Sequence, residues 1–215
     1  MATGGKTALF TFGRFQPPTL GHGVLFKELA TEATTTGADA FVFVSSTQDK
    51  KKNPLSVDRK VYWLERMYSE LPIRFVNTTT CTIDPMGKPC KTIFQVLDAL
   101  RNAGYTQLRM YVGSDRVADF TKMLGKYTSE TEVTVVSSGK ERNETSADLS
   151  GMSGTKMRNA AMRGNVEAFK RGTGFEESNA RELMGEVRAS MAGGKRTQKL
   201  KTRSRNTRRV KRKNV

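Results

Sequence analysis

Short apolar runs alternate along the chain with stretches in which apolar residues recur every three or four positions. The runs predict buried strands, and the stretches predict amphipathic helices. The predicted strands are residues 8–12, 40–44, 73–76, 108–112 and 133–136. Helical spacing follows the first four of them, over residues 20–29, 57–71, 92–103 and 117–124. This alternation predicts an α/β fold, doubly wound around a five-stranded parallel sheet.

The pattern changes after residue 137. Residues 138–151 are polar and predict a loop. Helical spacing returns over residues 155–163, where Gly164 is the expected stop, and again over residues 180–191. Ser178 is the predicted N-cap of this last helix, and Gly193-Gly194 is its predicted end. These C-terminal helices complete a single predicted domain of residues 1–192.

Charge is distributed unevenly. The chain of 215 residues holds 37 Lys and Arg against 21 Asp and Glu, a net charge of +16. Residues 195–215 contain 11 basic residues, no acidic residue and no hydrophobic periodicity. Residues 193–215 are therefore predicted to be a disordered basic tail. Such a tail binds nucleic acid nonspecifically by counterion release, or it serves only to keep the protein soluble.

The remaining composition bears on the cellular setting. No apolar run approaches the ~20 residues that cross a membrane, and residues 8–12 are too short for the core of a signal peptide. Cys81 and Cys90 are nine residues apart, which matches no standard zinc spacing. We expect free thiols in a reducing, cytoplasmic setting, with a Cys81–Cys90 disulfide as the minor alternative.

The turn after the first predicted strand carries the strongest chemical signal. Residues 13–23 read GRFQPPTLGHG and include Arg14 and the single histidine, His22. Ligands of parallel sheets bind at the carboxyl ends of strands, and the start of a helix attracts anions. With Arg14 and His22 as donors, this turn predicts a phosphate site. The alternative is that Gly21 and Gly23 only permit close packing and that His22 is structural.

GRFQPPTLGH resembles the signature of the HxGH nucleotidyltransferase superfamily, which has a Rossmann-like, cytidylyltransferase-like fold. The segment is most similar to the archaeal-type nicotinamide-mononucleotide adenylyltransferases and their phage and large-virus relatives. A second family segment, ISxTxxR, resembles residues 152–158, MSGTKMR. Asn53-Pro54-Leu55-Ser56 is similar to the family's NPF(S/T), and Gly113-Ser114-Asp115 is similar to its Gly-x-Asp turn. The resemblance covers about residues 6–165.

The chain also departs from the family pattern. Thr19 stands where the first His of HxGH is found, and Pro18 replaces a phenylalanine. Arg59 and Lys60 stand where the adenylyltransferases carry Glu-Arg. The first change removes one imidazole donor, although a threonine hydroxyl also bonds phosphate. The last change affects the identity of the acceptor more than the fold.

The resemblance implies roles for individual residues. His22, Thr19 and Arg158 are expected to act on the phosphates at the reacting centre. The expected nucleotide-binding residues are Gly13, Arg14, Phe15, Gly21, Asp115, Ser153, Gly154 and Thr155. Asn53 and Ser56 are expected to contact the acceptor substrate. For Asp115, a role as the cap of the following helix is equally compatible with the sequence.

The resemblance implies an enzyme that transfers a nucleoside monophosphate from a triphosphate, ATP in the first place, to a small phosphate-bearing acceptor such as nicotinamide mononucleotide. Mg²⁺ is expected to bind with the triphosphate rather than at a metal site of the protein. One alternative is a CTP-dependent cytidylyltransferase. Another is a nucleic-acid- or virion-associated binding protein on the same fold. Relatives often form oligomers, so a homo-oligomer is left open; a viral protein would act in the host cytoplasm or the virion.

Overall fold

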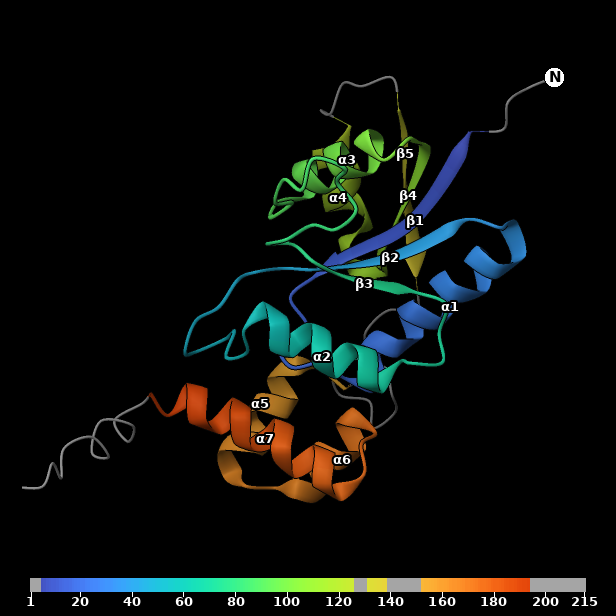
Figure 1. The fold of residues 1–215 in the computed structure, drawn as a ribbon. Helices are drawn as coiled ribbons and strands as arrows, with labels where there is room; N and C mark the ends of the chain where they lie inside the picture. Colours follow the sequence, from blue (N-terminus) through green and yellow to red (C-terminus); the bar gives the residue numbers. More distant parts are fainter. Residues whose placement is uncertain (1–4, 126–130, 139–151, 194–215) are drawn as a thin grey trace, which may run out of the picture.

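The computed structural model describes residues 5–125, 131–138 and 152–193, which form one parallel sheet covered by helices (Figure 1). The strand order is β3-β2-β1-β4-β5. The central strand β1 (Lys6–Gly13) pairs with β2 (Asp39–Val44) and with β4 (Tyr105–Gly113). The edge strands are β3 (Arg74–Asn77) and β5 (Glu132–Ser138). The predicted α/β fold with a five-stranded parallel sheet is confirmed.

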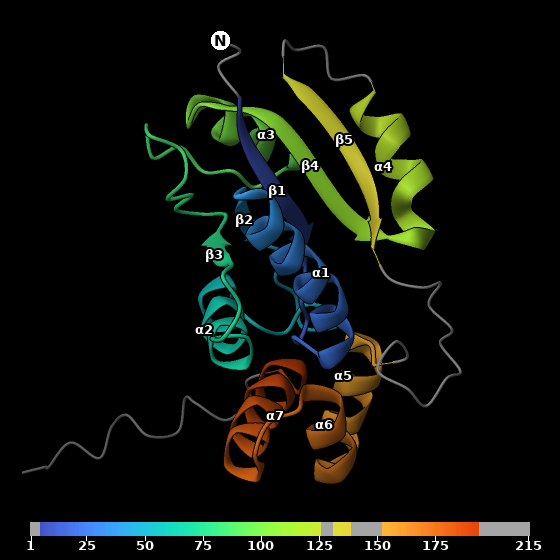
Figure 2. The ribbon, with the colours of Figure 1, turned by 90° about the vertical axis from the view of Figure 1, so that its right-hand side faces the viewer.

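Helices cover both faces of the sheet (Figure 2). The helices α1 (Leu20–Thr36) and α2 (Val57–Met67) lie on one face, and α3 (Ile93–Asn102) and α4 (Val117–Leu124) lie on the other. Successive side chains of a strand point to opposite faces. Leu9 accordingly packs in a cluster with Leu29 of α1, whereas Phe10 packs in a cluster with Leu97 of α3. Burial of both faces explains why the strands read as continuous apolar runs.

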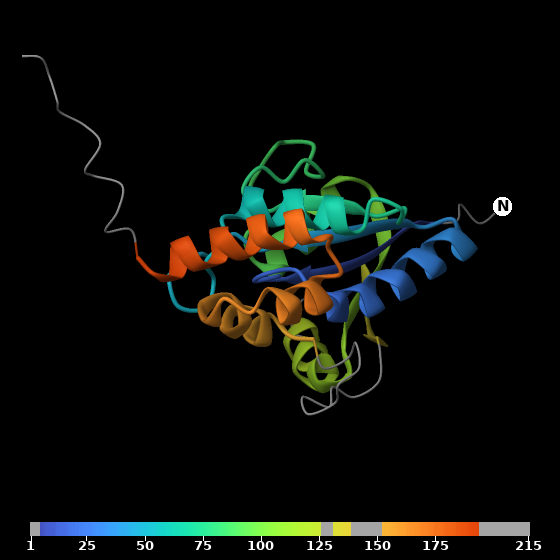
Figure 3. The same cartoon turned by 90° about the horizontal axis from the view of Figure 1, so that it is seen from below.

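Three C-terminal helices gather beyond the carboxyl end of the sheet, beside α2 (Figures 1 and 3). They are α5 (Gly154–Arg163), α6 (Val166–Thr173) and α7 (Glu177–Met191). One apolar cluster joins Trp63 of α2 to Phe169 of α6 and Leu183 of α7. The indole N–H of Trp63 donates to Glu186 over 3.1 Å. Trp63 is fully buried, as its place in an amphipathic helix predicts.

The C-terminal region also differs from its predicted boundaries. Glu176 is the N-cap of α7, and the predicted cap Ser178 lies inside the helix. Helix α6 was not predicted; it begins where the side chain of Asn165 accepts from the backbone N–H of Ala168. The predicted loop beyond Ser138 and the tail beyond Gly193 lie outside the described residues.

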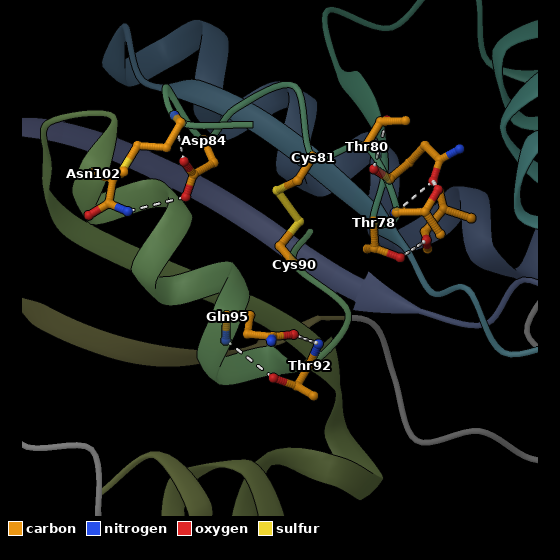
Figure 4. Close-up of a disulfide and its surroundings, with 12 residues drawn as sticks. Thr78, Thr80, Cys81, Asp84, Cys90, Thr92, Gln95 and Asn102 are labelled. Carbon is orange, nitrogen blue, oxygen red and sulfur yellow. Dashed lines mark hydrogen bonds between the residues drawn. A yellow bond between two sulfur atoms is a disulfide. The ribbon is translucent and has the colours of Figure 1, made fainter. Parts of the chain in front are cut away.

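Cys81 and Cys90 form a disulfide in the loop between β3 and α3 (Figure 4). Their Cα atoms are 5.7 Å apart, and both side chains are fully buried. The expectation of free thiols is therefore wrong. The loop turns back through Gly87, which has a left-handed φ of 65°, so residues nine apart in sequence meet in space. The cytoplasmic prediction loses the support it drew from free thiols. Within the described residues, no helix has the length and apolar character needed to cross a membrane.

Candidate functional site

A cavity of about 560 Å³ lies at the carboxyl ends of β1 and β4. Strand order reverses at this point, because β1 connects to β2 on one side and pairs with β4 on the other. Loops that leave neighbouring strands in opposite directions open a crevice between them. Gly13 at the end of β1 and Gly113 at the end of β4 both line the cavity. The fold thus places this cavity next to the turn that the sequence singled out.

The wall of the cavity is strongly basic. Its cationic members are Arg14, Lys52, Arg116 and Arg158, and no Asp or Glu occurs among its described residues. Burial and, next, the nearby charge of Arg14 lower the pKa of Arg158. Two guanidinium groups that repel each other across a hollow are stabilised by an anion placed between them. The cavity is therefore suited to a polyanionic ligand.

Two segments that are far apart in sequence meet at this wall. The guanidinium of Arg158 donates to the backbone oxygen of Gln16 over 2.6 Å and to the hydroxyl of Thr155 over 3.0 Å. A Cβ atom on Gly154 would lie 2.6 Å from the same Gln16 oxygen. Only glycine lets the start of α5 approach the first turn this closely. Residues 13–23 and 152–158 therefore face one cavity.

Thr19 and His22 form a linked pair at the start of α1. The backbone N–H of Thr19, the N-cap residue, donates to Nδ1 of His22 over 3.0 Å. His22 thus takes the place of the glutamate or glutamine in a capping box. Because Nδ1 accepts, the proton of the neutral ring lies on Nε2. His22 is one of the residues that line the cavity.

The hydroxyl of Thr19 does not face the cavity. Thr19 is fully buried, and its Oγ1 donates to the backbone oxygen of Met152 over 2.9 Å and lies 3.0 Å from Nδ1 of His22. The sequence led us to expect contact between this hydroxyl and phosphate. The structure instead places it between the two motif segments, where it holds the imidazole of His22 in position.

Aromatic packing and an amide pair fix the rest of the first turn. The ring of Phe15 meets the imidazole of His22 edge-on, with centroids 5.1 Å apart. Phe15 has a left-handed φ of 47°, a strained conformation for a bulky residue. The side-chain amide of the next residue, Gln16, exchanges two hydrogen bonds with the backbone of Leu55, of 2.8 and 2.9 Å. This pair anchors the turn to the loop before α2.

The start of α5 adds backbone donors. The hydroxyl of Ser153, the N-cap residue, accepts from the N–H of Lys156 over 3.3 Å. The first N–H groups of any helix have no acceptor within the helix. Ser153, Gly154 and Thr155 all line the cavity, so these groups lie at its wall. An anion is the natural partner for such an arrangement.

A tight turn at residues 49–53 forms another part of the wall. The carboxylate of Asp49 accepts from the backbone N–H groups of Lys52 and Lys51, over 2.7 and 2.8 Å, and from the side chain of Asn53. These bonds lower the pKa of Asp49 to about 2. Asn53 lines the cavity, and its side-chain oxygen is buried without a partner among the described residues. The turn holds Lys52 and Asn53 at the cavity.

Four of the predicted site residues are not on the cavity wall: Thr19, Gly21, Ser56 and Asp115. Ser56 caps α2, accepting from the N–H of Arg59 over 3.3 Å. Asp115 is exposed in the 3-10 turn Ser114–Arg116. The other nine predicted residues do line the cavity.

Sequence reasoning missed the roles of Arg116 and Phe120. Both line the cavity, and the guanidinium carbon of Arg116 lies 5.2 Å from the ring centroid of Phe120. The signal available in the sequence was a basic and an aromatic residue four apart, directly after a predicted strand.

No cluster of three His, Cys, Asp or Glu side chains able to hold a metal occurs in residues 5–125, 131–138 and 152–193. The donor set of the cavity is cationic and neutral.

The cytidylyltransferase-like family model matches residues 10–160. The chain therefore belongs to this family of nucleotidyltransferases. The matched region includes the whole first turn and most of α5, so it contains both segments that meet at the cavity. No curated protein sequence matches the chain significantly.

Solved structures resemble the fold at low sequence identity. One is a Vibrio parahaemolyticus protein, assigned provisionally as a nicotinate-nucleotide adenylyltransferase, which is 15% identical in sequence and has a TM-score of 0.53. The alignment covers 83% of this chain and 98% of the Vibrio chain. The Plasmodium falciparum nicotinic acid mononucleotide adenylyltransferase is 11% identical. Its complex with APC has a TM-score of 0.52 and covers 85% of this chain and 97% of its own. Its complex with NaAD has a TM-score of 0.50 and covers 85% and 94%.

Proposed function

We propose that the protein transfers the adenylyl group of ATP to a small phosphate-bearing acceptor such as nicotinamide mononucleotide, as its motif resemblance to the archaeal-type adenylyltransferases suggests. The supporting observation is the cavity at which both motif segments meet, whose described lining holds no acidic residue and in which Arg14 and Arg158 lie close together. A triphosphate and a second phosphate are the kind of ligand that such a wall accommodates. The Plasmodium relative, solved with NaAD, binds a dinucleotide.

The reaction needs no protein nucleophile. An oxygen of the acceptor phosphate attacks the α-phosphorus of ATP in line, a new P–O bond forms, and the bond to the bridging oxygen of the β-phosphate breaks. Pyrophosphate leaves with that electron pair. The task of the protein is to position the two phosphates and to stabilise the charge that builds up between them.

Each group of residues on the cavity wall is suited to one step of the nucleotidyl transfer. With Nδ1 accepting from Thr19, the Nε2–H of His22 would donate to the α-phosphate oxygens as their charge rises. Arg158, Ser153 and the first N–H groups of α5 would hold the departing pyrophosphate. Phe120 and Arg116 offer a flat, cationic surface for an aromatic ring of either substrate.

Mg²⁺ would bind with the triphosphate and neutralise part of its charge. Because the described lining contains no carboxylate, phosphate oxygens and water would supply most of its ligands. Thr11 and Asn53 are neutral oxygen donors on the same wall. They could complete the coordination of an ion that the nucleotide carries in.

The test is a panel of reactions monitored by pyrophosphate release. ATP and CTP are each combined with nicotinamide mononucleotide, nicotinic acid mononucleotide and a small alcohol phosphate, with Mg²⁺ present. We expect turnover with ATP and a mononucleotide acceptor. Turnover with CTP alone would support the cytidylyltransferase alternative. The absence of release from every pair would contradict an enzymatic function and favour a binding role.

Two variants of His22 separate its two nitrogen atoms. In His22→Asn the side-chain oxygen can still accept from the Thr19 N–H, but the donor at the Nε2 position is lost. In His22→Gln a donor near the Nε2 position is kept. We expect kcat to fall about 10²–10³-fold in His22→Asn and distinctly less in His22→Gln. Equal turnover in wild type and His22→Asn would remove this imidazole from the mechanism.

A further inference from the structure

The buried hydroxyl of Tyr68 connects the end of α2 to the start of α1. Tyr68 is the C-cap residue of α2, and its ring packs edge-on against Phe26 of α1, with centroids 5.0 Å apart. A phenylalanine would fill the same buried space. The hydroxyl adds a hydrogen bond of 2.7 Å, in which it donates to the backbone oxygen of Thr19, the N-cap residue of α1.

Gly23 makes room for this contact. A Cβ atom on Gly23 would lie 2.8 Å from the hydroxyl oxygen of Tyr68 and 2.8 Å from the ring carbon Cε1. A glycine in the first turn of α1 therefore lets the hydroxyl reach Thr19. Burial raises the pKa of Tyr68, against a smaller opposite effect of a hydrogen bond with the backbone of Gly23. The hydroxyl thus keeps its proton at neutral pH and remains a donor.

Thr19 links this hydroxyl to the imidazole of His22. The backbone N–H of Thr19 donates to Nδ1 over 3.0 Å, and its Oγ1 lies 3.0 Å from the same nitrogen. A backbone N–H can only donate, so it selects the form of the ring that carries the proton on Nε2. With its carbonyl held by Tyr68 and its hydroxyl held by Met152, Thr19 has little freedom to turn away from the ring.

A row of aromatic side chains makes a second connection between Tyr68 and His22. Phe26, which packs against Tyr68, has its centroid 5.5 Å from that of Phe15. Its ring is also stacked toward the imidazole, with centroids 6.5 Å apart. Phe15 in turn meets the imidazole edge-on. The hydrogen bonds and the ring contacts that hold His22 therefore both lead back to Tyr68.

We propose that Tyr68 is a positioning residue, which fixes the tautomer and the place of the His22 imidazole by holding Thr19 and so sets the rate of nucleotidyl transfer. This inference rests on the proposed function, in which the Nε2–H of His22 acts on the phosphates. Tyr68 is not among the residues that line the cavity, so it acts through Thr19 and the packed rings.

The first test observes the imidazole directly. His22 is the single histidine of the chain, so ¹⁵N NMR of the full-length protein shows one pair of ring nitrogens, whose chemical shifts report which of them carries the proton. At a pH where the ring is neutral, we expect the Nε2–H form in the wild type and a mixture of both forms in Tyr68→Phe. Gly23→Ala, which keeps the hydroxyl but displaces it, should give a mixture as well. A wild-type nitrogen spectrum in Tyr68→Phe would overturn the proposal.

The second test is kinetic. Tyr68→Phe should lower kcat with ATP and nicotinamide mononucleotide about tenfold, the size of effect expected for the loss of one hydrogen bond, and should leave KM for both substrates unchanged. Tyr62→Phe is the matched control, because it removes a hydroxyl from the same helix that accepts from Arg66 over 3.1 Å. The control should keep the wild-type kcat and the wild-type nitrogen spectrum. Equal losses of kcat in the two variants would contradict the role of Tyr68.

The outcomes separate this proposal from the proposed function. A mixture of ring forms in Tyr68→Phe with an unchanged kcat would overturn the effect of Tyr68 on the rate, while the proposed function would stand. If the wild type releases no pyrophosphate with any acceptor, the proposed function fails. The nitrogen spectra then still decide whether Tyr68 positions His22, because they do not depend on turnover.

Discussion

Lys60 is a buried cation close to the site. Its ammonium group is fully enclosed and donates to the backbone oxygen of Ser45, just past the end of β2. No carboxylate among the described residues pairs with it, and burial lowers its pKa to about 8 from an ordinary value of 10.5. The folded protein thus holds this proton less tightly than the unfolded chain does.

The free energy of unfolding should therefore rise with pH between about 8 and 10.5, because the unfolded chain binds more protons there. The contribution of Lys60 reaches about 3 kcal/mol at most, since one pKa unit corresponds to about 1.4 kcal/mol. Below about pH 8, Lys60 is charged in both the folded and the unfolded protein, and burial of this charge lowers the free energy of unfolding by its full amount.

Urea unfolding of the wild type and of Lys60→Met, measured from pH 7 to 10, checks this expectation. The difference between the two curves isolates Lys60 from tyrosines that titrate in the same range. Parallel curves would mean that Lys60 is not desolvated in the folded state.

At the scale of elements, the contact between α5 and the first turn depends on one missing side chain. In Gly154→Ala, the new Cβ atom would meet the Gln16 oxygen at 2.6 Å and push the start of α5 outward. We expect kcat/KM to fall about 10²-fold, because displacements near 1 Å have effects of this size. Steady-state kinetics and a thermal melt of the same sample separate this loss from unfolding.

Gly185→Ala is the matched control. Gly185 lies in α7, and nothing comes within 4 Å of a Cβ atom placed there. The same chemical change should leave catalysis intact and stabilise the protein by up to about 1 kcal/mol. Equal kinetic effects in the two variants would contradict the role assigned to Gly154.

The disulfide between β3 and α3 is the other element with a measurable contribution. It closes a loop of ten residues, for which the loss of unfolded-chain entropy corresponds to about 2.7 kcal/mol. Replacing Cys81 and Cys90 by alanine should lower the free energy of unfolding by roughly this amount. Chemical unfolding with and without reductant is the measurement, and reductant should affect only the wild type. Neither cysteine lines the cavity, so kinetics should be preserved.

For the molecule as a whole, the sequence predicted the sheet well, because strands buried on both faces and amphipathic helices leave clear periods. It also pointed to the first turn, where Arg14 and the single histidine follow a predicted strand, and to residues 152–158, which resemble the second segment of the family. It did not predict the disulfide, because spacing alone does not show whether a loop turns back. It did not predict that Thr19 is buried or that Arg116 and Phe120 reach the cavity, because both depend on how separate segments pack.

The hydrogen bond from Thr19 to Met152 bears on whether the protein can be made as two separate fragments. The two halves of the site are held by Thr19–Met152, by Arg158–Gln16 and by the apolar cluster around Trp63. None of these contacts runs through the covalent chain between residues 138 and 152. That stretch is thus a natural place to split the gene, so that activity would report on the reunion of two separately made fragments.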